Sequence, residues 1–202
     1  MSDDLAEALV DVRRAYRLVW AYQRRVNDLF QGIDVHLGRH GLRHAGWKPT
    51  SFANVPNQAF YRPNKWAWDM FPGFGVQVWW TGTGPRGPVR ADAWLYTDDG
   101  FQHTRGEPDP QCWEASPEQA RSKLWLYVAT GPAAPDWAAL HAHVETTDLV
   151  GAGKFDLPSG AYQVVCLLAG LEDLPDADAL HDRLLAPIDH WFAETASRHP
   201  GC

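Results

Sequence analysis

The chain has 202 residues, of which 45% are hydrophobic and 21% are charged. This balance supplies enough apolar surface for a buried core and excludes a highly charged, disordered protein. The formal net charge is -7, which argues against nucleic-acid binding because phosphate contacts require a basic surface. We therefore expect one folded domain over residues 1–202, with a protein or a small ligand as its partner.

The cysteines and the lengths of the apolar segments indicate the cellular location of the protein. The three cysteines, Cys112, Cys166 and Cys202, are odd in number and far apart, which fits neither a disulfide framework nor a zinc knuckle. The N-terminus lacks the apolar stretch of a signal peptide, and no segment reaches the roughly 18 apolar residues that a membrane span needs. These features predict a cytoplasmic protein that does not contact a membrane.

The first 40 residues predict a long amphipathic helix that ends near Gly41, a typical C-terminal cap. About 36 residues at 1.5 Å each give a length of about 54 Å, which exceeds the size of a compact domain of this chain length. We expect the helix to pack on a sheet with a bend near Gly32, and its heptad spacing leaves a homodimer through this helix open. The ten positions that alternate by four and three residues are Leu5, Leu9, Val12, Tyr16, Val19, Gln23, Val26, Phe30, Ile33 and Leu37.

The rest of the chain predicts a sheet followed by a helix. Turn residues between the first two strands indicate a hairpin, and the short connections favour antiparallel pairing. Pro187 should kink or break the last helix. The segments rich in β-branched and aromatic residues, which predict strands, are 75–81, 89–97, 124–128 and 162–168.

The predicted fold class is α+β. A long N-terminal helix packs on a mainly antiparallel, tryptophan-rich sheet of about four to five strands. A short inserted helix is expected after Pro135 and a C-terminal helix over residues 176–197, whereas residues 45–75 are expected to be irregular.

Two histidine groups are candidate metal sites. His36, His40 and His44 have the spacing of one helical face, but the helix is expected to end near His40 and to scatter the three. His141, His143 and Glu145 would share one face of a strand, although the surrounding pattern favours a short helix that would separate them. We predict no bound metal and no cofactor, with His141, His143 and Glu145 as the weak candidates.

The eleven tryptophans are the most unusual feature of the composition. Trp79 and Trp80 are adjacent, so a strand directs them to opposite faces of the sheet. Trp94 and Tyr96 alternate with Arg90 and Asp92 on one face of the next strand. Aromatic and charged groups together are typical of a binding surface. We predict that this face binds a partner through Arg90, Asp92, Trp94, Tyr96 and Trp79, while a purely structural core remains the alternative.

No motif in the sequence fixes a reaction, and the balance favours a protein that is not an enzyme. The leading hypothesis is a non-enzymatic binding or interaction protein of bacterial type, such as an immunity or accessory factor, that uses the aromatic and charged sheet face. The first alternative is a metal-dependent hydrolase or nuclease with a site built from His141, His143 and nearby carboxylates. The second is a small-molecule-binding domain with a tryptophan-lined pocket between helix and sheet.

Overall fold

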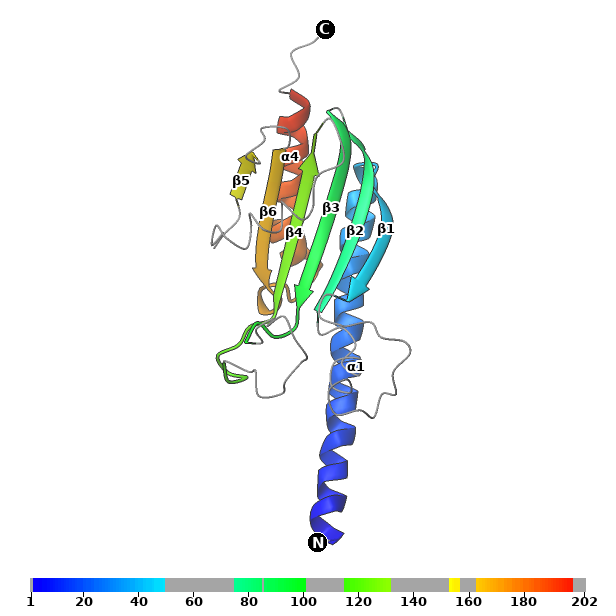
Figure 1. The fold of residues 1–202 in the computed structure, drawn as a ribbon, viewed down its shortest axis with the longest axis vertical. Helices are drawn as coiled ribbons and strands as arrows, with labels where there is room; N and C mark the ends of the chain where they lie inside the picture. The colour runs from blue at the N-terminus through cyan, green and yellow to red at the C-terminus, as the bar shows by residue number, and fades with distance from the viewer. Residues whose placement is uncertain are drawn as a thin grey trace, which may run out of the picture.

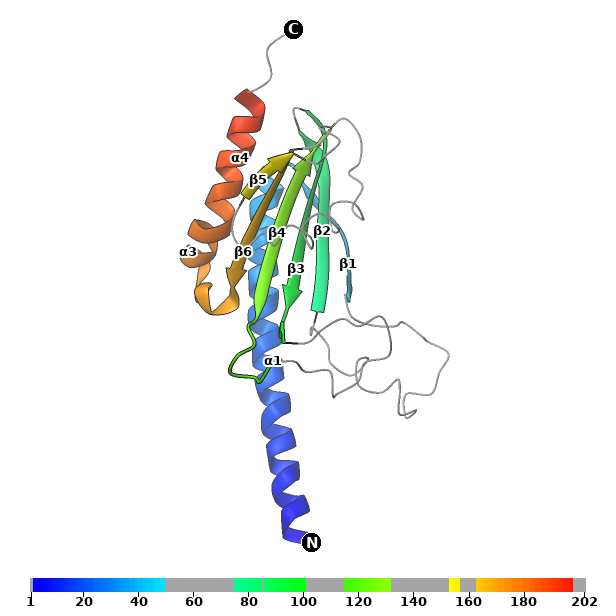
Figure 2. The ribbon, with the colours of Figure 1, turned by 60° about the vertical axis from the view of Figure 1, so that its left-hand side comes forward.

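The fold is a single sheet with helices on one of its faces (Figure 1, Figure 2). The structure is a computed structural model, and it describes residues 2–49, 75–84, 86–100, 115–131, 153–156 and 163–197. The predicted α+β class, with its long N-terminal helix, antiparallel sheet and C-terminal helix, is confirmed. None of the described helices combines the length and the hydrophobicity that crossing a bilayer requires.

The sheet has six strands in the order β1-β2-β3-β4-β6-β5, and all neighbours are antiparallel. Strands β2, β3 and β4 are adjacent in the sheet in chain order; residues 85–86 connect β2 to β3, whereas residues 97–122 lie between β3 and β4. The predicted hairpin is confirmed, and its two strands approach each other until Gly84 pairs with Gly87. The strands are β1 (Arg43–Pro49), β2 (Gly75–Gly84), β3 (Gly87–Tyr96), β4 (Lys123–Thr130), β5 (Gly153–Asp156) and β6 (Gln163–Gly170).

Two edge strands were not predicted. Strand β1 overlaps the segment that the sequence predicts as irregular, and that prediction is wrong for residues 45–49. Its period of two is broken by a β-bulge between His44 and Gly46, which hides the strand signal. Strand β5 is only four residues long, which gives too short a pattern to recognise.

Helix α1 (Ser2–Arg39) runs through Gly32 without interruption, and its N-terminal half projects beyond the sheet (Figure 1). The expected bend near Gly32 is therefore wrong. A Cβ at this glycine would lie 2.9 Å from Leu180 Cδ2, so the residue permits close packing of α1 against the C-terminal helices. The excess length of the helix is accommodated by projection instead.

The core lies between the helices and one face of the sheet. The C-terminal half of α1 contributes Val26, Leu29, Ile33 and Leu37. Each central strand presents alternate residues to these side chains, as the period of two requires. The strand residues of the core include Val78, Trp80, Ala91, Ala93, Leu95, Leu124, Leu126, Val128, Val165 and Leu167. The first half of the helix has no such partner among the described residues.

The C-terminal helical segment begins where the predicted helix over residues 176–197 begins, and the Asp176 carboxylate caps it by accepting a hydrogen bond from Ala179 N at 2.8 Å. It consists of α3 (Ala177–Leu180), a π-helical turn η2 (His181–Leu185) and α4 (Ala186–Ser197). Pro187 has no N–H to donate to the preceding turn, which is the position of the wide π turn. The predicted irregularity is thus present, but as a widened turn within a continuing helical segment.

Two short helical elements remain, one that was not predicted and one that was. A 3-10 helix, η1 (Leu171–Asp173), precedes α3 and has no counterpart in the predictions. The short helix predicted after Pro135 lies outside the described residues.

Gly41 forms the C-terminal cap of α1, and a substitution at this residue can test it. Leu42 N donates to Leu37 O and Gly41 N donates to Gly38 O, which is the Schellman pattern, and Gly41 has φ +78. We expect Gly41→Ala to lower the free energy of unfolding by about 1 kcal/mol, because a Cβ disfavours positive φ. Gly38→Ala is the matched control: its Cβ meets no atom within 4 Å, so it should raise stability by about 0.5–1 kcal/mol. Urea unfolding distinguishes the two, and a loss in both variants would contradict this assignment.

Candidate functional site

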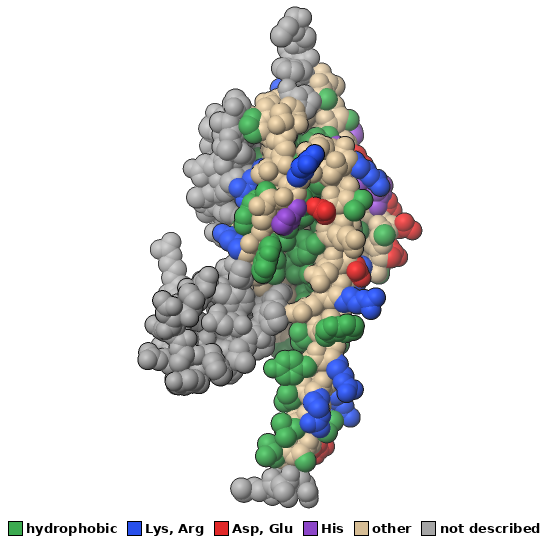
Figure 3. Space-filling model, turned by 90° about the vertical axis from the view of Figure 1, so that its right-hand side faces the viewer, with side chains coloured by type: hydrophobic (Ala, Val, Ile, Leu, Met, Phe, Trp, Pro, Cys, Tyr) green, Lys and Arg blue, Asp and Glu red, His purple; other side chains and the backbone are tan. Residues whose placement is uncertain are grey.

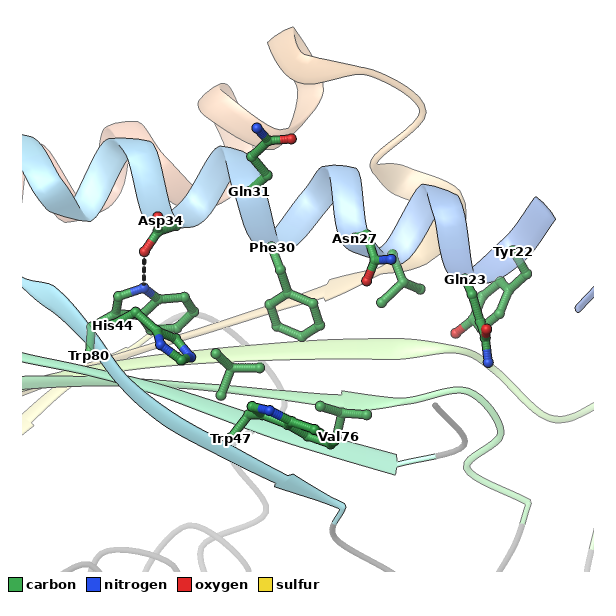
Figure 4. A pocket seen from close by; sticks show the side chains of 12 residues that line it. Tyr22, Gln23, Asn27, Phe30, Gln31, Asp34, His44, Trp47, Val76 and Trp80 are labelled. Carbon is green, nitrogen blue, oxygen red and sulfur yellow. Dashed lines mark hydrogen bonds between the residues drawn. The ribbon is translucent and has the colours of Figure 1, made fainter. Parts of the chain in front are cut away.

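A groove of about 680 Å³ lies between α1 and the strands β1 and β2. Val76 and Trp80 line it from β2, Phe30 points into it from α1, and amide side chains of α1 border it (Figure 4). Trp80 Nε1 donates to Asp34 Oδ1 at 2.7 Å, which joins β2 to the helix. The volume is within the range of small-molecule sites, so the small-molecule hypothesis stays a prediction for this groove. The complete lining is Tyr22, Gln23, Val26, Asn27, Phe30, Gln31, Asp34, His44, Trp47, Val76, Val78 and Trp80.

The bulge in β1 shapes one wall of the groove. His44 pairs with Trp80 and Gly46 pairs with Trp79, so Ala45 is the extra residue. His44 and Trp47, three positions apart, consequently both line the groove, which a regular strand would prevent (Figure 4). A Cβ on Gly46 would lie 2.4 Å from the Trp79 ring, so glycine is required where that ring crosses the strand. Trp47 itself is 64% exposed.

An apolar stripe extends from the groove along the projecting helix. We call it the α1 stripe, and it consists of Leu5, Leu9, Val12, Tyr16 and Val19. These side chains are between 41% and 67% exposed, although the same spacing continues through Gln23 and Phe30, which line the groove. Figure 3 shows hydrophobic side chains along one side of this helix and arginine or lysine side chains along another. Stripe and groove therefore form one continuous surface.

A second cluster joins the end of α1 to α4. His36 and His40 are four residues apart and lie on one face of the helix. Their Nε2 atoms are 2.9 Å and 2.5 Å from the same oxygen, Asp189 Oδ1. Phe192 stacks on the His40 ring with centroids 4.2 Å apart, and His181 lies edge-on to His36 at 6.1 Å. The cluster can therefore hold a proton or a metal ion between three converging ligand atoms.

The pKa values of His36 and Asp189 are both lowered, but for different physical reasons. Burial lowers the pKa of His36, and this effect outweighs the nearby Asp189 carboxylate, which acts to raise it. Partial burial acts to raise the pKa of Asp189, but the hydrogen bond from His40 and the charges of both imidazoles bring it below its usual value. Asp189 is consequently ionised near neutral pH.

Comparison with known proteins identifies the family of the chain. A family model described as PM0109 matches residues 2–184, which include α1 and the whole sheet. The chain belongs to the PM0109 family. No curated protein and no solved structure matches it. The family description names no activity, ligand or partner.

In this PM0109 family member, the five residues predicted to bind a partner do lie on one sheet face, opposite the helices. Arg90 and Asp92 alternate with core residues of β3, and Trp79 pairs with Asp92 from the neighbouring strand. The Arg90 guanidinium lies 5.5 Å from the Trp79 ring centroid, and Trp94 stacks on Tyr96 at 6.4 Å. The expected juxtaposition is therefore present, and partner binding by this face stays a prediction.

Asp92 is the least accessible of the five, at 0% exposed. Arg90 donates to it twice, from Nε to Oδ2 at 2.8 Å and from Nη2 to Oδ1 at 3.0 Å. Gln77 Nε2 donates to Oδ1 at 2.5 Å. Burial raises the pKa of Asp92, although Arg90 and Gln77 oppose this effect. The carboxylate is thus engaged in intramolecular bonds that a partner would have to replace.

The predicted metal candidates His141, His143 and Glu145 lie outside the described residues. The expectation that the helix end scatters His36, His40 and His44 holds only for His44, which lines the groove. It is wrong for His36 and His40, which stay on one helical face and converge on Asp189. The sequence gives no indication that Asp189 approaches the other two, because it is about 150 positions away. The HxxxH spacing at the end of the helix was the signal, and the third ligand depends on the tertiary fold.

Proposed function

We propose that this protein is a non-enzymatic interaction protein that binds an amphipathic, acidic helix of a partner along the α1 stripe and into the groove. One observation carries the proposal: the stripe is exposed over its whole length and leads without interruption into the groove. Monomeric soluble proteins rarely expose a contiguous apolar surface of this kind unless it binds something. The proposal keeps the predicted class of function but uses a different surface from the predicted sheet face.

The spacing of the stripe favours a helical occupant. Alternation of four and three residues is the pattern that forms knobs-into-holes contacts with a second helix. Every described side chain from Leu5 to Ala21 is exposed, apart from the half-buried Val10. These 17 residues give a free helical length of about 25 Å. A partner helix of four to five turns could therefore pack along it before its end reaches the groove.

Charge favours an acidic partner over a second copy of the chain. Residues 5–25 hold five arginines and two acidic residues, Glu7 and Asp11. Arg13, Arg17 and Arg24 are exposed and recur at spacings of four and seven, so they form a row along one flank of the stripe. In an antiparallel pair of identical helices the two arginine rows would face each other. In a parallel pair each row would face the flank with Ala8 and Ala15, which offers no charge.

The direct test uses a synthetic peptide as the probe. It carries leucine at the a and d positions and glutamate on both flanks, and a second version has lysine in place of glutamate. We expect the glutamate peptide to bind with a dissociation constant in the micromolar range and the lysine peptide to bind at least about tenfold more weakly. Fluorescence anisotropy measures both, and light scattering should give the mass of a monomer for the protein alone.

Matched variants locate the binding surface. Leu9→Gln with Tyr16→Gln should weaken binding of the glutamate peptide by about tenfold or more, whereas Leu18→Gln should not, because Leu18 is 73% exposed but off the stripe. Arg13→Gln with Arg17→Gln should weaken it several-fold at low salt, and Arg14→Gln, which removes the partner of Asp11, is the control.

Three outcomes would contradict the proposal. Equal binding of the lysine peptide would remove the charge argument. A stable dimer that Leu9→Gln dissociates would make a second copy the occupant. A loss of unfolding free energy above about 1 kcal/mol in the stripe variant would mean that the chain covers its own stripe, since exposed substitutions rarely cost so much.

A further inference from the structure

We propose that His36, His40 and Asp189 form a binding site for a divalent transition-metal ion of the zinc type, which joins the last turn of α1 to α4. The three ligand atoms all lie within 4.8 Å of one another. Two of them come from the end of α1 and the third comes from α4, so a bound ion would hold the end of α1 against α4. This site is separate from the groove and does not depend on the proposed interaction.

The chemistry of the ligands suits zinc. Imidazole nitrogen and carboxylate oxygen bind Zn²⁺ at about 2.0–2.2 Å in tetrahedral sites, which places neighbouring ligand atoms about 3.3 Å apart. The two imidazole nitrogens are now 2.9 Å and 2.5 Å from Asp189 Oδ1. Each separation must therefore widen by less than about 1 Å, which side-chain rotation can supply. A preference for imidazole ligands also separates zinc from Mg²⁺ and Ca²⁺, which take oxygen ligands.

His36 supplies a second, independent observation. Its side chain is only 5% exposed, and Nε2 faces the Asp189 carboxylate at 2.9 Å without the geometry of a hydrogen bond. The Asp189 carboxylate that it faces is shared with His40, and no well-aligned hydrogen bond satisfies the nitrogen within the part of the chain that the structure describes. A buried polar atom without a well-aligned hydrogen bond costs free energy, and coordination to an ion would satisfy it.

An ion can reach this cluster from solvent, and the His40 ring is held in place. The side chains of His40 and Asp189 are 21% and 46% exposed, so an ion can enter from solvent and keep a water molecule as its fourth ligand. Phe192 stacks on the His40 ring and limits its rotation. An open fourth position makes the site accessible to an exogenous ligand, although the proposal itself concerns only binding of the ion.

The experiment measures zinc binding to the full chain without a histidine tag, after removal of metal with a chelator. We expect one zinc ion per chain with a dissociation constant in the micromolar range or below, and no binding of Mg²⁺ at the same concentration. Zinc should also raise Tm by several degrees, since a ligand that binds only the folded state stabilises it.

Substitutions assign the ion to this cluster. His40→Ala and Asp189→Asn should each weaken zinc binding by about tenfold or more and abolish the rise in Tm. His190→Ala is the matched control, because His190 is the neighbour of Asp189 on α4 but pairs with Glu194. Because His36 is buried, His36→Gln is used only if its apo form has the Tm of the native apo protein.

Either of two results would overturn the proposal. One is less than stoichiometric zinc in the native chain under conditions where the protein is folded. The other is unchanged affinity in both His40→Ala and Asp189→Asn, which would mean that zinc binds elsewhere in the chain.

Discussion

Replacing Trp80 with alanine should lower the free energy of unfolding by about 3–5 kcal/mol, the cost of removing a large aromatic side chain from a core. Trp80 is 1% exposed, lies on β2 and packs against α1. Its Nε1 also donates to Asp34 Oδ1. The variant therefore loses apolar burial and one bond between helix and sheet, and a cavity remains beneath the groove.

Two further variants separate these contributions. Trp80→Phe keeps part of the ring burial but loses the bond to Asp34, and we expect a loss of about 1–2 kcal/mol. Trp47→Ala removes a tryptophan from the wall of the same groove, but this side chain is 64% exposed and should cost less than about 0.5 kcal/mol. Urea unfolding followed by circular dichroism gives all three values. Similar losses for Trp47→Ala and Trp80→Ala would contradict the expectation that burial of Trp80 causes the effect.

The elements that sequence patterns predict well are those with long, uniform periodicity. The alternation of four and three residues gives α1, and the alternation Val89, Ala91, Ala93 gives β3 with its core face. These patterns report directly which side chains face an apolar layer, so they fix the fold class and the faces of the central strands. The period of two along β3 is also sufficient to predict that Arg90 and Asp92 share one sheet face.

The same patterns fail where tertiary contacts decide the outcome. The apolar positions of α1 keep one spacing from Leu5 to Leu37, but only those from Val26 onward are buried in the core, and nothing in the spacing marks this boundary. The bulge at Ala45 shifts the faces of β1, so the sequence does not show that His44 and Trp47 share a groove. The approach of Asp189 to the histidines of α1 depends on the packing of two helices from opposite chain ends.

The second large effect concerns the buried ion pair on the other sheet face. We expect Arg90→Ala to lower the free energy of unfolding by about 3 kcal/mol at pH 7.5, because it leaves Asp92 buried without its charge partner. Asp92→Asn should cost less. The amide can still bond to Gln77, and the Arg90 side chain is 23% exposed, so water can solvate its charge.

The pH dependence of Arg90→Ala distinguishes an uncompensated charge from lost packing. Burial already raises the pKa of Asp92 in the folded protein, and removal of Arg90 takes away an interaction that lowers it. Below the unfolded pKa of about 3.9, Asp92 is protonated in both states and the penalty disappears. As pH rises from that value through the folded pKa, the unfolded state ionises first and stability falls. The difference between Arg90→Ala and the native protein should therefore be smaller at pH 4.5 than at pH 7.5. An equal difference at both values would mean that Arg90 stabilises the sheet through its contact with Trp79 alone.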